Sequence, residues 1–425
     1  MVTPKVERII ARVPMNKNAL TVINRLTEAG FEAYLVGGCV RDMLLGREPK
    51  DFDVVTDAYP EQVKGVFRNC RLIGRRFRLA HVWFGREIIE VATFRARHSD
   101  TGEGEGTEEE RRVRDNTYGT QEEDAWRRDF TVNALYFDVQ HSSVIDYVGG
   151  LEDLDAGVLR LIGDPRTRYR EDPVRMLRAV RFASKLGLRL GGETESLLYE
   201  MGALLEGMPP ARLFEETLKL FMGGAALATF EMLRHYRLFG YLFPQTEVAL
   251  SREEQGFPLM LLHHALLNTD QRLTEGKPVT PAFLFAAFLW EPMRQMAEEL
   301  RAGDMSEIQS IQNAGSEVIL RQTRRVSLPR RFSRISREIW QLQPRLFRRT
   351  GKQPSRLIQH PRFRAAYDFL LLRREAGEDV GALCDWWTEF QQADDERKNA
   401  LMGEVSGPKK KRSRSRRKRK QPPTE

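Results

Sequence analysis

The hydrophobic pattern of this 425-residue chain changes near residue 150, and that change limits the folds open to it. Up to that point, short apolar segments bounded by turn residues alternate with segments of helical periodicity. The expected strands are 32–36, 51–56 and three short ones within 71–94, and the expected helices are 17–30, 39–46 and 60–68. Beyond residue 151, apolar residues recur with helical spacing and strand patterns nearly vanish. The sequence predicts an α/β domain at residues 1–150 followed by an all-α remainder.

Within the α/β part, a Gly-Gly pair stands just ahead of two aspartates separated by a single residue. The two segments are LVGGCVRDMLLG at 35–46 and KDFDVVT at 50–56. On a strand, side chains at i and i+2 leave the same face, so Asp51 and Asp53 are expected to place two carboxylates side by side. Such a pair suits Mg²⁺ or Mn²⁺ held together with substrate phosphates. The pattern points to nucleotidyl transfer.

The glycines fit the same chemistry. Gly37 and Gly38 let the backbone approach a phosphate without Cβ interference, and the helix that follows carries Arg41 toward the same anion. Taken singly, a Gly-Gly pair is most often a turn and an Asp-x-Asp a solvated strand end. The ordered combination of strand, Gly-Gly, helix and paired aspartates is far more specific.

Two further segments add candidates to this site. Glu90 sits among β-branched residues in REIIEVATFRAR, where it either completes a carboxylate triad or is a salt-bridged or solvent-facing strand residue. RRDFTVN supplies Arg127 and Arg128 for a triphosphate, and Asp129 for a ribose hydroxyl or the metal cluster. Asn133 closes the same segment and is a further candidate for binding the nucleotide.

The segment YREDPVRMLRAVRF at 169–182 predicts a helix start with Asp172 as the N-cap and Pro173 in the first position. Basic residues recur at three-residue steps along this helix, at Arg175, Arg178 and Arg181, and these arginines are expected to form a basic ridge on one side of it. An Asp and an Arg side by side present an acceptor and donors in one plane, which is what reading a nucleobase edge requires. Capping and base reading both account for Asp172.

The net charge of +8 is unevenly distributed. Residues 409–420 carry ten basic residues and no acid, which leaves the rest of the chain near −2. This tail is expected to be a solvated arm attracted to phosphate backbones, with a solubility or localisation tag as the alternative. Residues 324–364 carry thirteen Lys or Arg against one acid, and their aromatics Phe332, Trp340, Phe347 and Phe363 are expected in a helical core.

Other classes of protein are less compatible with the chain. We expect no membrane span and no secretion signal, and the three cysteines have neither zinc nor disulfide spacing, so a cytoplasmic location is predicted. His263, His264 and Asp270 in LLHHALLNTD raise a metal-dependent phosphohydrolase as an alternative, but no second His-Asp set accompanies them.

The segments LVGGCVRDMLLG, KDFDVVT, RRDFT and EDPVRMLRAVRF together resemble the superfamily of class II tRNA nucleotidyltransferases and bacterial poly(A) polymerases. GRRFRLAHVWFG, EIIEVATFR, PPARLFEETLKLF and the Arg-rich tail are more similar to the poly(A) polymerase branch. The resemblance covers roughly residues 30–400. It implies a nucleotidyltransferase head at 1–150 with a flexible insertion at 99–120, a helical neck at 151–225, an RNA-binding body and leg at 226–400, and a disordered tail at 401–425.

The resemblance also implies roles for individual residues. The positions that match the active centre are Asp51, Asp53, Glu90 and Asp129, with the first three as metal ligands. The positions that match triphosphate and ribose contacts are Gly37, Gly38, Arg41, Arg127 and Arg128. The positions that match the base-reading helix are Glu171, Asp172, Arg175 and Arg178.

The activity implied is template-independent transfer of AMP from ATP to RNA 3′ ends, by two-metal in-line attack with release of pyrophosphate. An RNA chaperone or RNA-decay proteins are partners that the resemblance implies. A CCA-adding tRNA nucleotidyltransferase and a non-catalytic RNA-binding protein on the same fold remain as alternatives.

Overall fold

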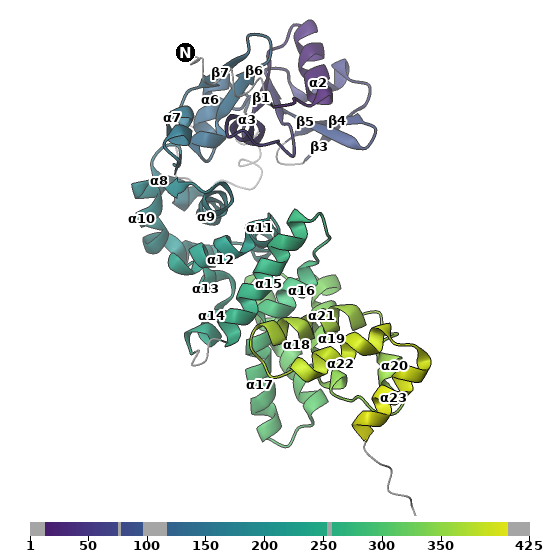
Figure 1. Ribbon diagram of the computed structural model, residues 1–425. Helices are drawn as coiled ribbons and strands as arrows, with labels where there is room; N and C mark the ends of the chain where they lie inside the picture. Colours follow the sequence, from purple (N-terminus) through teal and green to yellow (C-terminus); the bar gives the residue numbers. More distant parts are fainter. Residues whose placement is uncertain (1–12, 75–77, 97–116, 253–256, 407–425) are drawn as a thin grey trace, which may run out of the picture. The chain divides into compact units, whose positions relative to one another are not determined.

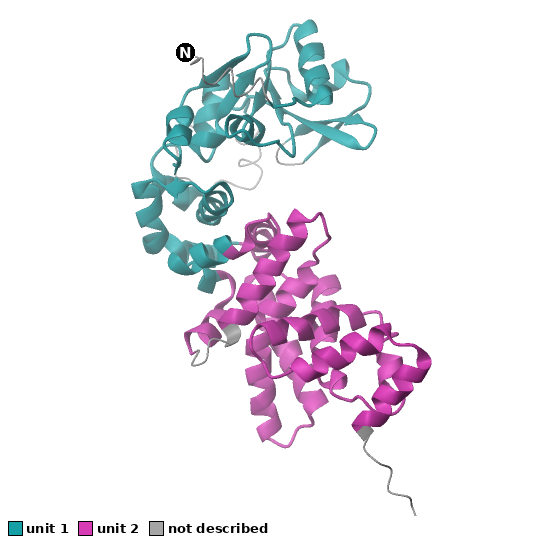
Figure 2. Cartoon of the chain, viewed as in Figure 1, with its two compact units in different colours: residues 1–208, 228–241 teal, residues 209–227, 242–425 magenta. Residues whose placement is uncertain are grey.

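The computed structural model describes residues 13–74, 78–96, 117–252 and 257–406. It divides into two compact units (Figure 2): unit 1 comprises residues 1–208 and 228–241, and unit 2 comprises residues 209–227 and 242–425. Most of the insertion expected at 99–120, and the basic tail from residue 407, lie outside the described residues.

Unit 1 contains a seven-stranded sheet with the order β3-β4-β5-β2-β1-β6-β7 (Figure 1). Its strands are β1 Ala33–Val36, β2 Val54–Thr56, β3 Cys70–Ile73, β4 Leu79–Phe84, β5 Glu87–Thr93, β6 Leu135–Asp138 and β7 Ser143–Asp146. The β2–β5 pair is parallel and the other neighbours are antiparallel. The sheet confirms the α/β prediction for this part of the chain.

Helices cover both faces of this sheet at its centre. On one face, helices α2 (Lys17–Glu28) and α4 (Pro60–Val66) bury Val22 and Val63 against strand residues such as Val54 and Val91. On the other face, α6 (Gln121–Arg127) and the chain around Ile162 pack against Val55 and Tyr136. Because β2 is covered on both faces, its residues VVT are all buried.

Strand β2 starts at Val54, so the expectation of a strand from residue 51 was wrong at its N-terminal end. β1 ends at Val36 because Gly37 turns away with a φ of +76°, which leaves residues 51 and 52 without a partner strand. The last ladder hydrogen bond runs from Val36 N–H to the Asp53 carbonyl at 3.1 Å. Alternation nevertheless holds, since Phe52 and Val54 enter the same core.

The rest of unit 1 is mainly helical. Its elements are the 3₁₀ turn η1 Thr131–Asn133, α3 Gly38–Leu44, α7 Gly150–Asp155, α8 Pro165–Glu171, α9 Val174–Leu186, α10 Gly192–Met201 and η2 Gly202–Gly207, with the two-residue strands β8 Val158–Leu159 and β9 Arg189–Leu190. The N-cap of α9 is Pro173, not the expected Asp172, whose Oδ1 still accepts from Val174 N–H at 3.2 Å. The shift arises because Asp172 also ends α8 as its C-cap.

Unit 2 is built from helices, as the sequence predicted. The helices of this part of the chain are α11 Pro210–Phe221, α12 Ala226–His235, α13 Phe239–Leu242, α14 Pro244–Ser251, α15 Phe257–Thr274, α16 Pro281–Phe288, α17 Trp290–Ala302, α18 Glu307–Arg325, α19 Arg330–Leu346, α20 Gln353–Leu357, α21 Phe363–Glu375, α22 Gly381–Gln392 and α23 Asp395–Ser406, of which most of α12 and α13 belongs to unit 1. Among the described residues, every helix is too short or too polar to cross a membrane.

The aromatic residues of the basic zone at 324–364 mostly join the core. Trp340 and Phe363 are buried, and Phe332 packs against Phe214 with ring centroids 6.1 Å apart. Phe347 is 53% exposed, so its assignment to the core was wrong. It follows the last residue of α19, where the helical face that buries Trp340 no longer continues.

Candidate active site

Three carboxylates lie close together on one face of the sheet of unit 1. Asp51 and Asp53 flank the buried Phe52, so both side chains point away from the core that holds it. Glu90 precedes Val91, which is the parallel partner of Val54, so Glu90 lies beside Asp53 on the neighbouring strand. All three side chains are exposed to solvent. The structure therefore brings the predicted acids together.

The surroundings of Asp53 raise its pKa. The protein atoms around Asp53 remove enough water to raise its pKa, the charge of Glu90 adds to the increase, Arg128 opposes it, and Asp51 adds a smaller increase. The result is a pKa of about 6 for Asp53. Because a divalent ion neutralises neighbouring carboxylates, its binding beside Asp53 would lower this pKa.

The predicted metal ligands are Asp51, Asp53 and Glu90. Over the described residues, no group of three His, Cys, Asp or Glu side chains converges in a way that could hold one ion. Glu90 lies 3.5 Å from His81 Nε2, and this contact engages its Oε1 atom. Asp51 and Asp53 fit a Mg²⁺ ion, because Mg²⁺ is commonly held by one or two carboxylates together with substrate phosphates. The role of Glu90 as a third ligand stays a prediction.

The Gly-Gly turn is packed directly against Asp53. Gly37 has a φ of +76°, and a Cβ there would lie 3.3 Å from Arg128 Nη1 and 3.4 Å from the Asn133 carbonyl, so only glycine fits without strain. Gly38 begins α3. The buried Cys39 thiol donates to the Val36 carbonyl at 3.3 Å, and the Val36 N–H donates to the Asp53 carbonyl at 3.1 Å, which ties the turn to the acidic pair.

A chain of polar contacts joins this turn to helix α9. Arg41 is only 5% exposed, and its Nη1 donates to Asn133 Oδ1. The Asn133 amide donates to Asp129 Oδ1 at 3.4 Å, and Asp129 Oδ2 accepts from Arg178 Nε at 2.8 Å. Arg41, Asn133, Asp129 and Arg178 therefore form one network across three separate segments of unit 1.

Asp129 is thereby engaged as the anchor of Arg178. Burial alone would raise the pKa of Asp129, but the charge and hydrogen bonds of Arg178, together with the Phe130 N–H and the Asn133 amide, outweigh it and lower the pKa. Asp129 is thus an ionised carboxylate paired with Arg178. A direct catalytic role for it stays a prediction.

Three guanidinium groups surround the ring of Phe182 on α9. Their carbons lie 5.5 Å from the ring centroid for Arg41, 5.6 Å for Arg178 and 4.4 Å for Arg181. Phe182 in turn meets Phe130 edge to face, with centroids 5.6 Å apart. Sequence analysis did not single out Phe182, although the RAVRF spacing places it beside Arg178 on the helix.

Arg128 is fixed by residues that sequence analysis also missed. Asp124 Oδ2 accepts from Arg128 Nη2 at 2.9 Å and from the Tyr136 hydroxyl at 2.9 Å. Asp124 is 6% exposed, and its i, i+4 spacing to Arg128 was the available signal. Because Asp124 holds Arg128, its guanidinium stays beside Gly37.

The remaining predicted residues cluster where α8 meets α9. Arg168, which sequence analysis missed, donates to the carbonyls of Arg127 and Arg128 at 2.9 Å and 2.6 Å and to Glu171 at 2.9 Å. Glu171 also accepts from Arg175 at 2.7 Å. Arg175 therefore forms an ion pair with Glu171, and Asp172 Oδ1 accepts from Val174 N–H at the start of α9.

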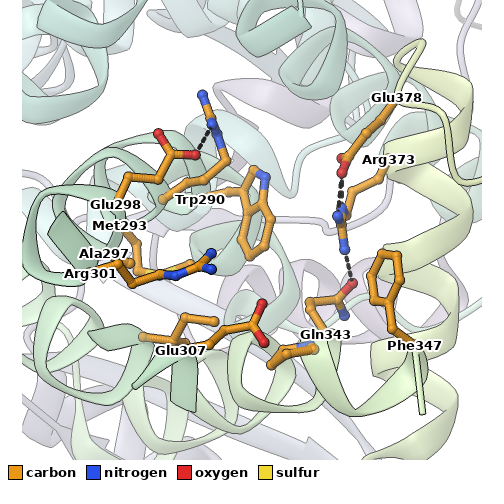
Figure 3. A pocket seen from close by; sticks show the side chains of 13 residues that line it. Trp290, Met293, Ala297, Glu298, Arg301, Glu307, Gln343, Phe347, Arg373 and Glu378 are labelled. Carbon is orange, nitrogen blue, oxygen red and sulfur yellow. Dashed lines mark hydrogen bonds and ion pairs between the residues drawn. The ribbon is translucent and has the colours of Figure 1, made fainter. Parts of the chain in front are cut away.

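Two features of unit 2 do not form a comparable site. Asp270 accepts from the N–H groups of Ala226 and Leu227, at the start of α12, which accounts for this residue without a phosphohydrolase. A pocket of about 240 Å³ is lined by Trp290, Arg373 and other residues of four helices (Figure 3). Its Arg373 is held by Glu378 and Gln343, so its charge is already paired.

Comparison with known proteins assigns separate segments of the chain. Residues 33–160 match the model of the poly A polymerase head domain, residues 187–250 match that of the probable RNA- and SrmB-binding site of polymerase A, and residues 303–421 match that of the polymerase A arginine-rich C-terminus.

Curated relatives are similar over nearly the whole chain. Poly(A) polymerase I of Haemophilus influenzae is 48% identical over 414 residues, which is 95% of this chain and 92% of that protein. Poly(A) polymerase I of Salmonella typhi is 47% identical over 98% of this chain and 91% of that protein. A CCA-adding enzyme of Lactobacillus helveticus is 40% identical, over only 50% of this chain and 52% of that enzyme.

Solved structures share the fold. The CCA-adding enzyme of Bacillus stearothermophilus in complex with CTP has a TM-score of 0.59 and 26% identity, covering 89% of this chain and 83% of that one. The Thermotoga maritima CCA-adding enzyme complexed with tRNA has a TM-score of 0.60 and 20% identity, covering 92% and 86%.

Proposed function

Because the chain belongs to the bacterial poly(A) polymerase family, it is a polynucleotide adenylyltransferase, and we propose that Asp51 and Asp53 are the centre of its active site. The enzyme transfers AMP from ATP to the 3′ ends of RNA without a template. The observation that carries the site assignment is the pair of exposed carboxylates packed against the Gly37-Gly38 turn. No other acidic pair among the predicted site residues lies beside such a turn.

The residues divide the work between metal and nucleotide. Asp51 and Asp53 would hold Mg²⁺, which when bound supplies Lewis-acid polarisation of the α-phosphate and a lower pKa for the RNA 3′ hydroxyl. The Gly37-Gly38 backbone leaves room for the triphosphate, and Arg128 beside it neutralises negative charge as pyrophosphate leaves. No covalent enzyme intermediate is required.

The arginine network would position the incoming nucleotide. Arg41 and Asn133 connect the triphosphate turn to Asp129, and Asp129 orients Arg178 on α9. Arg175 and Glu171 lie at the start of the same region, where an acceptor and a donor meet at 2.7 Å. We assign recognition of the adenine edge to this end of α9. Arg41, being buried, acts as a positioning residue.

Amide substitutions test the acidic pair. Asp51→Asn and Asp53→Asn are each expected to lower AMP incorporation into an unstructured RNA by roughly a hundred- to a thousandfold or more, because preorganised charge at the transferring phosphate is lost. Asp57→Asn is the matched control, because Asp57 is an exposed acid that directly follows β2. Its Oδ1 accepts a hydrogen bond from Glu32 N–H. Near-normal tailing by either active-site variant, with RNA binding intact, would overturn the assignment.

A second assay separates the activity from CCA addition. The protein is incubated with a generic single-stranded RNA and each of the four triphosphates, and then with a tRNA that lacks its CCA end and CTP. Long A tails without incorporation of CMP are expected. Cytoplasmic location and contacts with an RNA chaperone or RNA-decay proteins stay predictions.

A further inference from the structure

The acidic pair lies at one end of a row of side chains that crosses strands β3, β4 and β5. Arg71 on β3 is the antiparallel partner of His81 on β4, and His81 is the partner of Glu90 on β5. Glu90 lies beside Asp53 through the parallel β2–β5 register. Partners in a sheet share a face, so all four side chains leave the sheet on the same side.

Trp83 stands one step further along this face. It is two residues beyond His81 on β4, and its partner on β5 is Ile88. Trp83 and Ile88 are 36% and 37% exposed, while Val82 and Ile89 between the rows are buried on the opposite side. The Trp83 backbone is fixed from both sides by Asn69, whose carbonyl accepts from Trp83 N–H at 3.0 Å and whose amide donates to the Trp83 carbonyl.

Basic residues border the exposed indole. Arg68, Asn69, Cys70, Arg71 and Trp83 line an open recess of about 400 Å³ at the β3 edge of the sheet. Arg68 and Arg71 are exposed, and within the described part of the chain neither forms an ion pair with a carboxylate. Two uncompensated guanidiniums beside an aromatic ring favour a ligand with both phosphates and flat bases.

We propose that this β3–β5 face, formed by Arg71, His81, Trp83 and Ile88, binds the RNA nucleotides next to the 3′-terminal one, with a base stacked on Trp83 and phosphates paired with Arg68 and Arg71. The proposal rests on the proposed function, because Asp51 and Asp53 fix where the 3′ hydroxyl reacts. His81 links the face to that site through its contact with Glu90.

The spacing agrees with this occupant. Trp83 is the diagonal neighbour of Glu90 across β4 and β5, so the two residues are about 7–8 Å apart. Successive stacked bases rise by about 3.4 Å, so Trp83 lies about two bases from Glu90, and Asp53 lies beyond Glu90 next to the neighbouring strand β2. Stacking on an indole is tolerant of sequence, as tailing of many RNAs requires.

The experiment reads stacking without turnover. A single-stranded RNA carries fluorescent 2-aminopurine either at the second or third nucleotide from its 3′ end or ten nucleotides upstream, and is titrated with the full-length protein in the absence of ATP. The wild-type protein is expected to quench the 3′-proximal probe strongly. Trp83→Ala is expected to abolish that quenching, Trp83→Phe to restore most of it, and the upstream probe to respond equally in all three.

Kinetics then give the size of the effect. Trp83→Ala is expected to raise KM for RNA by about tenfold at unchanged KM for ATP, the factor expected for one lost stacking contact. Arg71→Ala is expected to weaken RNA binding and to reduce the salt dependence of that binding. Arg25→Ala is the charge control and should leave both unchanged, because Arg25 is exposed on α2, which covers the opposite face of the sheet.

The outcomes separate this proposal from the assignment of the acids. If Trp83→Ala quenches the 3′-proximal probe like the wild type and tails RNA with an unchanged KM, the β3–β5 face does not bind the RNA end. That result would leave the assignment of Asp51 and Asp53 to the active site unaffected. If Asp53→Asn tails normally, the active site itself is misplaced.

Discussion

Removing Arg178 is expected to destabilise unit 1 by leaving Asp129 as a buried charge without its cation. The Asp129 side chain is 13% exposed and that of Arg178 is 32% exposed. Breaking a fully buried pair by removing one partner costs about 3–5 kcal/mol. Because Arg178 retains a third of its exposure and Asp129 keeps the Phe130 N–H, Arg178→Ala should cost about 2–3 kcal/mol.

The cost has a defined pH dependence. The pKa of Asp129 is lowered in the folded state, so the pair stabilises the fold above the ordinary Asp pKa, about 4, and this contribution is lost as the pH falls through the folded pKa. Without Arg178, burial favours the protonated acid. The difference in unfolding free energy between wild type and variant should therefore be largest near neutral pH and shrink toward acid.

Calorimetry and urea unfolding at neutral and acidic pH measure this difference. For a unit of this size, the expected fall in Tm at neutral pH is about 5–10 °C. Arg189→Ala, an exposed arginine on β9, should change stability by less than about 0.5 kcal/mol. Equal stability of Arg178→Ala and the wild type, or a penalty that grows on acidification, would refute the assignment of an ionised, Arg178-paired Asp129.

Three further predictions concern the turn, the acids and a helix start. Gly37→Ala forces a φ of +76° on a residue with a Cβ, and that Cβ would lie only 3.3 Å from Arg128 Nη1. The substitution should therefore lower the free energy of unfolding by about 1–2 kcal/mol and weaken ATP binding, as measured by unfolding and by nucleotide titration. Unchanged ATP affinity would contradict the placement of the triphosphate. The Mg²⁺ concentration for half-maximal tailing should rise below pH 6, because Asp53, with a pKa of about 6, then binds a proton in competition with the cation. A half-maximal Mg²⁺ concentration that stays constant from pH 5.5 to 7.5 would argue against Asp53 as a ligand. Asp270→Ala should lower the stability of unit 2 by about 1 kcal/mol, because the N–H groups of Ala226 and Leu227 lose their hydrogen-bond acceptor, and KM for ATP should not change. A loss of activity with intact stability would instead favour a catalytic Asp270.

Local pattern was sufficient to predict strand β5 and the common direction of the two aspartates. Alternation around Glu90 predicted β5, and the buried Phe52 between two aspartates predicted their common direction, because period-2 geometry extends past the point where the ladder of β2 ends. The strand boundary was wrong because it depends on β1, whose length is set by the turn at Gly37.

The network behind the site was beyond local pattern. Arg41 and Asn133 are 92 residues apart in the sequence, and Asp129 and Arg178 are 49 apart, so no spacing rule connects them. Arg41 is only 5% exposed and donates to Asn133, a contact that its sequence context did not indicate, and its contact with phosphate stays a prediction. Phe347 differs in the opposite sense, because its apolar helical pattern predicted burial whereas the packing of unit 2 leaves it exposed.

Anomalous X-ray scattering from Mn²⁺ bound with a non-hydrolysable ATP analogue tests the central claim most directly. The expected result is a manganese peak coordinated by Asp51 and Asp53, with the triphosphate running toward Gly37 and Arg128. A peak bound elsewhere, or a triphosphate remote from that turn, would contradict the account.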